Sequence, residues 1–138
     1  MTNTPSAGSL RLRYLVPPVL WALLIFVVSS IPGNELQAPD IFQFDKLAHL
    51  GVYFVLALLV YRALRVKELF PRLHSHATSV TMLLIALYGA SDEFHQVFVP
   101  GRSVDLFDWL ADALGGVLCA LVVVLLTRRH SRKTAAGA

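Results

Sequence analysis

The chain has 138 residues, of which 56% are hydrophobic and only 15% are charged. A soluble domain carries roughly 25% charged residues, so this composition excludes both a disordered chain and an ordinary soluble fold. Because one membrane-spanning helix takes about 20 residues, four spans would use nearly all of the apolar residues. We therefore predict one domain, residues 1–138, with an all-α fold: a polytopic membrane protein built as a four-helix transmembrane bundle.

Four apolar segments follow one another along the chain, each long enough to cross or nearly cross about 30 Å of hydrocarbon. They lie near residues 14–31, 47–64, 79–98 and 110–127. We expect the bundle core over about 14–127, with mobile tails at 1–10 and 128–138. The first segment has a longer apolar run than a usual signal peptide and no small-residue cleavage site after it, so we expect it to be retained.

Charged residues divide between the two sides of the predicted bundle. Ten of the twelve Lys and Arg residues fall in the tails or between the second and third spans. The other side holds Lys46 and Arg102, together with eight of the nine acids. Since cytoplasmic loops retain Lys and Arg, we predict cytoplasmic termini, with the 32–45 and 99–107 loops outside. The pI of about 9.4 then reflects topology, and nucleic acid is not an expected partner.

Ionisable residues at the acidic side lie on helix faces that predict a shared site. On an ideal helix Asp45, His49 and Tyr53 recur every four residues and form one ridge. The third span carries Asp92 and Glu93 about 10 Å inside its outer mouth. Charged groups at that depth normally face a bundle interior or a water-filled cavity. We therefore expect the ridge and the two acids to face one pocket.

The turn after the third span and the start of the fourth span carry further polar residues on the same side of the bundle. Pro100-Gly101 favours a turn with the glycine at positive φ, and Asp105 is a candidate N-cap with Asp108 three residues later. Gly89 on the third span allows another helix to approach closely. One face of the fourth span carries acids toward the outside and small residues further in, namely Asp105, Asp108, Asp112, Gly115, Gly116 and Cys119. The small-xxx-small spacing of Gly115 and Cys119 predicts close helix packing in the inner part of this span.

We predict that these helices converge on a polar pocket in the outer half of the bundle. Arg102 is the expected partner of Asp92 and Glu93, because a forked guanidinium suits carboxylates and an unpaired buried charge is costly. The candidate binding residues are Asp45, Lys46, His49, Tyr53, Asp92, Glu93, His95, Gln96, Arg102, Ser103, Asp108 and Asp112. If a cation binds, its candidate ligands are His49, Asp92 and Glu93. No cofactor is expected.

Structural roles stay open for several of these residues. Helix capping is the alternative role for Asp45, Lys46, Asp105 and Asp108. For His49 the alternative is hydrogen-bonded packing, and for Arg102 it is a structural ion pair.

Several short segments, in this order and spacing, resemble the VanZ-like family over about residues 14–127. They are Ser29-Ser30-Ile31-Pro32, Asp45-Lys46 with His49 and Tyr53, Asp92-Glu93 with His95-Gln96, Val99-Pro100-Gly101-Arg102-Ser103, and Asp108 with Asp112 and Gly115. The resemblance implies a small bacterial integral membrane protein, similar to an accessory factor that lowers susceptibility to the lipoglycopeptide teicoplanin. On that ground we expect it in the bacterial cytoplasmic membrane.

Three classes of function stay open. The pocket and the resemblance favour binding or shielding of a cell-envelope component, with a lipid-linked or glycopeptide ligand at the outer leaflet. The alternative is a membrane-embedded acid/base or metal-assisted enzyme acting on a lipid-linked envelope substrate, although the sequence has no HExxH, GxSxG or P-loop motif. A conduit would need polar residues through the inner half of the spans, where the sequence has almost none.

Overall fold

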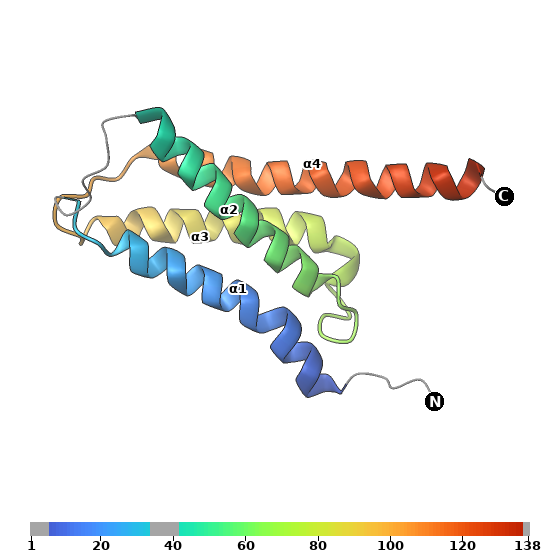
Figure 1. Cartoon of the computed structure of the whole chain (residues 1–138). Helices are drawn as coiled ribbons and strands as arrows, with labels where there is room; N and C mark the ends of the chain where they lie inside the picture. Colours follow the sequence, from blue (N-terminus) through green and yellow to red (C-terminus); the bar gives the residue numbers. More distant parts are fainter. Residues whose placement is uncertain (1–5, 34–41, 137–138) are drawn as a thin grey trace.

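The computed structural model of the chain describes residues 6–33 and 42–136, which contain four long helices arranged as a bundle (Figure 1). They are α1 (Ala7–Ser29), α2 (Phe42–Leu64), α3 (Ala77–Gln96) and α4 (Leu106–Ala136), with a short 3-10 helix, η1 (His74–His76), before α3. Every regular element in the described residues is helical, which confirms the all-α prediction. Residues 1–5 of the predicted tail and residues 34–41 of the predicted outer loop lie outside the described ranges.

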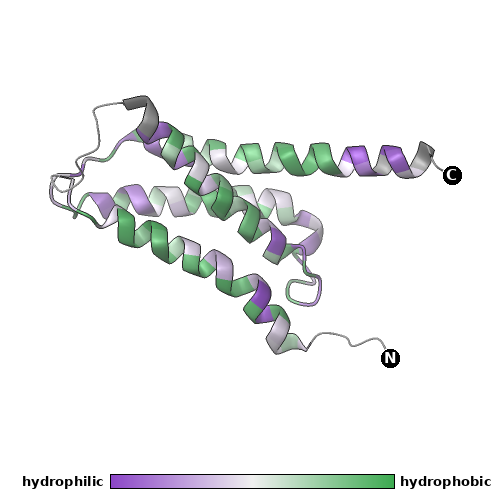
Figure 2. Cartoon of the chain, in the orientation of Figure 1, coloured by the Kyte–Doolittle hydropathy of each residue, from purple (hydrophilic) through white to green (hydrophobic). Residues whose placement is uncertain are grey.

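Three of the described helices are long and apolar enough to cross a membrane: α1, residues 45–64 of α2 and residues 106–134 of α4. α3 has 20 residues but is not among them, because small and polar residues on one face lower its hydropathy. That face is buried, and its residues follow one another at the three- or four-residue spacing of a helix face. They are Ala77, Thr81, Ile85, Gly89, Asp92, Glu93 and Gln96. The protein is therefore a helical membrane bundle in which α3 turns its polar face inward. Figure 2 shows that α3 is less uniformly hydrophobic than the middle of α4.

Within the tails predicted at 1–10 and 128–138, residues 7–10 and 128–136 are helical, and residues 137–138 lie outside the described ranges. α1 begins at Ala7, since the Ser6 side chain accepts a hydrogen bond from the Ser9 backbone N–H at 3.3 Å, an N-cap contact. The basic stretch at the end of α4 continues the helix because Arg and Lys are good helix formers that also complement the C-terminal end of the helix dipole.

Small residues bring α4 against α2, as the sequence predicts. A Cβ atom added to Gly115 would lie 2.8 Å from both the Leu50 carbonyl oxygen and the Phe54 backbone nitrogen of α2. Cys119, one turn further along α4, is buried in the same core cluster as Ala57 of α2. Because backbone atoms cannot rotate away as side chains do, only glycine at position 115 permits this helix approach.

α3 meets α4 through the predicted glycine. A Cβ atom added to Gly89 would lie 2.9 Å from Oδ2 of Asp112. The indole Nε1 of Trp109 donates a hydrogen bond to the Ala86 carbonyl at 3.0 Å. Together these contacts fix α3 and α4 side by side, with the polar face of α3 toward α4.

α1 packs more loosely than the other helices. Its buried residues are Ile25 and Ser29. Two side-chain hydrogen bonds tie the middle of α1 to the bundle: Trp21 Nε1 donates to the Val52 carbonyl at 3.0 Å, and the Tyr88 hydroxyl donates to the Ala22 carbonyl at 2.6 Å. Figure 1 shows α1 diverging from α3 toward its N-terminus. The fold is thus a close α2–α3–α4 group with α1 laid against one side.

Candidate functional site

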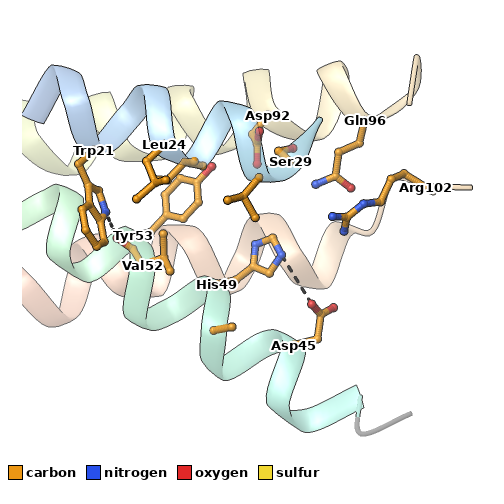
Figure 3. Close-up of a pocket in the computed structure, with 13 residues that line it drawn as sticks. Trp21, Leu24, Ser29, Asp45, His49, Val52, Tyr53, Asp92, Gln96 and Arg102 are labelled. Atoms are coloured by element: carbon orange, nitrogen blue, oxygen red, sulfur yellow. Dashed lines mark hydrogen bonds and ion pairs between the residues drawn. The ribbon is translucent and has the colours of Figure 1, made fainter. Parts of the chain in front are cut away.

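A cavity of about 300 Å³ lies between α1 and α2, and residues from α3 and the following turn line one end of it (Figure 3). Its polar lining residues are Ser29, Asp45, His49, Tyr53, Asp92, Gln96 and Arg102. Its apolar lining residues are Trp21, Leu24, Ile25, Val28, Ala48 and Val52. The polar groups gather where α1 ends and α2 begins, and the apolar groups extend toward the middle of the bundle. Six of the twelve predicted site residues line this amphipathic cavity.

Two buried hydroxyls line the cavity wall. Among the described residues, the Ser29 hydroxyl has no hydrogen-bond partner. The Tyr53 hydroxyl, in a residue that is only 1% exposed, lies near Asp92 without the geometry of a full hydrogen bond. Figure 3 shows the Tyr53 hydroxyl directed toward the side of the cavity that carries Asp92. A buried polar group without a partner costs about 1–3 kcal/mol. A ligand or water molecule that supplied the missing hydrogen bonds would therefore be stabilised here.

His49 lies between two carboxylates at the polar end of the cavity. Asp112 Oδ1 is 2.9 Å from His49 Nδ1, and Asp45 Oδ1 is 3.9 Å from His49 Nε2. Asp112 is 0% exposed, whereas the Asp45 side chain is 54% exposed. Asp112 does not line the cavity, but its hydrogen bond orients the imidazole that does. A buried carboxylate that orients a histidine is the arrangement used to position a general base.

Lys46 joins the start of α2 to the start of α4. Its ammonium hydrogen-bonds Asp105 at 2.6 Å and Asp108, and it lies 3.6 Å from Asp45. The hydrogen bond from Lys46 is the main reason that the pKa of the Asp105 carboxyl lies below its usual value. Asp105 also accepts a hydrogen bond from the Phe107 backbone N–H at 2.8 Å, which confirms the predicted N-cap.

The predicted ion pair between Arg102 and the two acids of α3 is wrong. Within the described residues, no ion pair joins Arg102 to Asp92 or Glu93. Arg102 Nε instead donates to the Ile31 carbonyl at 3.3 Å, and Glu93 accepts a hydrogen bond from the Asp105 backbone N–H at 2.9 Å. Consecutive helix residues point about 100° apart. Asp92 therefore lines the cavity while Glu93 turns toward the start of α4.

Of the six predicted binding residues that do not line the cavity, His95 and Ser103 also lie apart from the ion-pair network at its polar end. His95 Nε2 is 2.9 Å from the Ser30 hydroxyl, and its ring centroid is 4.5 Å from that of Phe26. His95 thus joins α3 to α1, because it points about 100° away from its neighbour Gln96. Ser103 is exposed in the loop before α4.

The structure does not bring together the three predicted metal ligands, His49, Asp92 and Glu93. Among the described residues, the ligand atoms of Asp45, His49 and Asp108 lie within 4.8 Å of one another, and neither acid of α3 belongs to this group. The ammonium of Lys46 already contacts both Asp45 and Asp108. We therefore assign this acidic group to an ion-pair network.

The turns at the polar end are held together by two glycines. The Gly33 backbone N–H donates to the Pro100 carbonyl at 3.0 Å, and a Cβ atom on Gly33 would lie 2.0 Å from the Gly101 carbonyl oxygen. Gly101 has φ 73°, as the Pro-Gly turn predicts. This contact places Arg102 at the mouth of the cavity.

Sequence reasoning missed the contribution of α1 to the site. α1 supplies Trp21, Leu24 and Ser29 to the cavity lining, although we predicted no site residue in the first span. The available signal was Ser29, a hydroxyl at the end of an apolar run. An apolar helix otherwise gives no indication of which face lines a cavity and which face contacts lipid.

These features define a small helical membrane protein with an amphipathic cavity between two of its helices. A family model described as VanZ/LLP1 matches residues 7–127, so the chain belongs to the VanZ/LLP1 family, as its motifs indicate. It is also 34% identical, over 112 residues, to an uncharacterized protein of the fission yeast Schizosaccharomyces pombe. That match covers 80% of this chain and 65% of the yeast protein. No solved structure matches the chain significantly.

Proposed function

We propose that the chain binds an amphiphilic, lipid-linked component of the cell envelope in the cavity between α1 and α2. By shielding that component, it lowers susceptibility to lipoglycopeptides such as teicoplanin. The observation that supports this proposal most strongly is that the cavity is amphipathic: polar groups line one end, whereas Trp21, Leu24 and Val52 line the other. Ligand sites are typically apolar with a few placed polar groups that fix orientation. A molecule with a polar headgroup and an acyl tail satisfies both ends.

The polar end favours a headgroup that both donates and accepts hydrogen bonds. Asp92 supplies acceptors and Arg102 supplies donors, while the buried hydroxyls of Ser29 and Tyr53 can do either. A hydroxyl-rich or zwitterionic headgroup matches this mixture better than a purely anionic one. Similarity to a yeast protein also favours a lipid class, because lipids are common to bacterial and yeast membranes.

The exposed surface of α1 gives a lipid tail a route into the cavity. Leu24 and Val28 line the cavity and are also about half exposed on the outside of the bundle. The apolar wall is therefore continuous with the surface that faces hydrocarbon. A tail can enter sideways from the bilayer without crossing the polar end.

We place this site at the outer leaflet of the bacterial cytoplasmic membrane, with both termini in the cytoplasm, because the Lys and Arg residues gather at the opposite end. Thiol labelling of single-cysteine variants on a Cys119→Ser background tests this orientation. Ser103→Cys should react with an impermeant reagent applied to intact cells, whereas Glu68→Cys should not. Labelling of residue 68 from outside would reverse the orientation and remove the proposed access to envelope ligands.

Drug susceptibility tests the proposed function. The wild type and the Asp92→Asn and Arg102→Met variants would be expressed at matched levels in a glycopeptide-sensitive Gram-positive host. The wild type should protect against teicoplanin more than against vancomycin, which lacks the acyl tail, and both variants should lose that protection. Arg132→Gln, a charge change at the far end of α4, is the control and should retain it. A well-expressed wild type that gives no selective protection would contradict the proposal.

A second candidate function is acid/base catalysis on the same class of lipid-linked substrate. The pair of His49 with buried Asp112 favours it, because Asp112 positions the imidazole while Nε2 stays available at the cavity. The two functions are separated by incubating purified protein with envelope lipid extract and following lipid masses. Turnover that is lost in His49→Gln would favour the enzyme, and retention of unchanged lipid would favour binding.

A further inference from the structure

At the end of the bundle opposite the cavity, two arginines approach one aromatic ring. The guanidinium carbons of Arg13 and Arg62 lie 5.6 Å and 5.8 Å from the centroid of the Tyr14 ring, which are cation–π distances. Arg13 and Tyr14 belong to α1 and Arg62 to the last turn of α2, so the ring links the two helices. This contact places both guanidiniums beside the same ring where α1 and α2 meet.

No described acidic side chain forms an ion pair with either arginine. Both arginines are exposed, and both end in flexible side chains. Two flexible guanidiniums beside one ring, neither paired with a described carboxylate, favour an anion that both can reach, and guanidinium binds phosphate through paired N–H donors. The charge pattern therefore points to a phosphate group as the ligand.

An apolar groove of about 250 Å³ begins one helix turn away from this ring. Its lining includes Pro18 and Val19 of α1, Val60 of α2 and Leu84 of α3. Tyr14 and Pro18 are four residues apart, so they share a helix face and are separated by about 6 Å along the axis. The groove shares no lining residue with the cavity described above. A cationic site and an apolar groove are thus continuous along α1.

We propose that this face binds one anionic phospholipid, with its phosphate at Arg13 and Arg62 and one acyl chain in the groove. The charge pattern selects an anionic lipid over a zwitterionic one, because the site offers two cations and no described acid to hold an ammonium group. The groove selects a lipid over a free phosphate. This site differs from the envelope-ligand cavity in position, charge and lining, so either can fail without the other.

Native mass spectrometry of the full chain in detergent tests the lipid headgroup. Phosphatidylglycerol and phosphatidylcholine with identical acyl chains would be added at equal concentrations, and phosphatidylglycerol should be retained preferentially. Because each arginine at a membrane surface contributes about fivefold to anionic lipid binding, the double variant Arg13→Gln, Arg62→Gln should lose about 25-fold. The double variant Arg129→Gln, Arg132→Gln removes the same charge from α4 and should retain the lipid.

A second pair of variants tests the groove at constant charge. Leu84→Trp fills the groove and should lower phosphatidylglycerol retention, whereas Leu83→Trp changes the adjacent exposed residue and should not. Glycerol phosphate should fail to displace the lipid. Circular dichroism in detergent checks that each variant keeps its helical content. Equal retention of the two lipids, equal loss in both double variants, or equal loss in both tryptophan variants would overturn the proposal.

Discussion

The α2–α3–α4 group and α1 are held by different kinds of contact. Inside the group, helix backbones meet at Gly115, and the buried pair of His49 and Asp112 ties α2 to α4. α1 has two buried residues, and most of its large apolar side chains are exposed. The charged groups of the site therefore stand on the closely packed part, while the loosely packed helix supplies the lipid-facing wall.

With this arrangement, a small membrane protein can combine a fixed polar site with lateral access for a ligand from the bilayer. Charged side chains in the bundle need partners held in place, because an unpaired charge in a membrane is expensive. An apolar helix contacts lipid as readily as protein, so little free energy is lost where α1 leaves the bundle. Substitutions in the α2–α3–α4 group should therefore change mainly the free energy of unfolding, whereas substitutions in α1 should change mainly ligand binding.

The largest effect is expected where the backbones of α2 and α4 meet. Gly115→Ala places a Cβ atom 2.8 Å from two backbone atoms of α2, and overpacking of this kind costs about 3 kcal/mol. Gly51→Ala is the control, because a Cβ atom there meets nothing within 4 Å. Unfolding titrations in mixed detergent should show a large decrease in the free energy of unfolding for Gly115→Ala and no decrease for Gly51→Ala. If the two variants had similar free energies of unfolding, α2 and α4 would be able to move apart and accept the added Cβ atom.

The next largest effect should come from the buried carboxylate. Asp112→Leu leaves His49 without its partner at Nδ1, and removing one partner of a buried hydrogen bond costs about 1–2 kcal/mol. Asp45→Leu removes the more exposed acid beside the same histidine, and should change the free energy of unfolding by less than about 0.5 kcal/mol. Equal effects of the two substitutions would argue against an orienting role for Asp112.

Two tryptophans allow the two parts of the molecule to be compared with the same substitution. Trp109→Phe removes a hydrogen bond between α4 and α3, and Trp21→Phe removes one between α1 and α2. Each such bond is worth about 0.6 kcal/mol in a membrane protein. We expect Trp109→Phe to lower the free energy of unfolding, and Trp21→Phe mainly to change retention of the cavity ligand. If Trp21→Phe lowered the free energy of unfolding and Trp109→Phe mainly changed ligand retention, the division into a closely packed α2–α3–α4 group and a loosely packed α1 would be contradicted.

The smallest effect concerns Asp105. Because its pKa in the folded protein is lowered mainly by the hydrogen bond from Lys46, its contribution to stability is present above the unfolded-state pKa and is lost as pH falls through the lowered value. Asp105→Asn should therefore be slightly less stable than the wild type at neutral pH, and the difference should vanish in acid. Thermal unfolding of both proteins between pH 7 and acid measures it. A difference independent of pH would exclude this ion pair as the cause.

The sequence predicts the helices well because apolar length and helix-face spacing are local properties. It also identifies Gly89 and Gly115 as close-approach positions, since small residues in a span have few other uses. The partners of charged side chains could not be predicted in the same way. Arg102 and Lys46 are both near acids in the sequence, but only the turn geometry and the 100° step between neighbours decide which acid each can reach.

The same limit explains the errors within the candidate site. His95 lies between residues that belong to the site and yet points toward α1, because one helix position changes the direction of a side chain completely. The contribution of α1 depends on its packing against α2, which no periodic pattern within α1 encodes. Cavity walls made of leucine look like ordinary lipid-facing surface until the partner helix is placed.

Photo-crosslinking in living cells tests most directly whether the cavity holds a specific lipid-linked ligand. A photoreactive phenylalanine analogue would replace Leu24, which lines the cavity, or Leu23, which is equally exposed but lies outside the lining. Mass spectrometry of the purified adducts would then identify the captured lipids. We expect one discrete amphiphile at position 24, absent in the Asp92→Asn background, and a mixture of bulk phospholipids at position 23. The same bulk mixture at both positions would contradict this expectation.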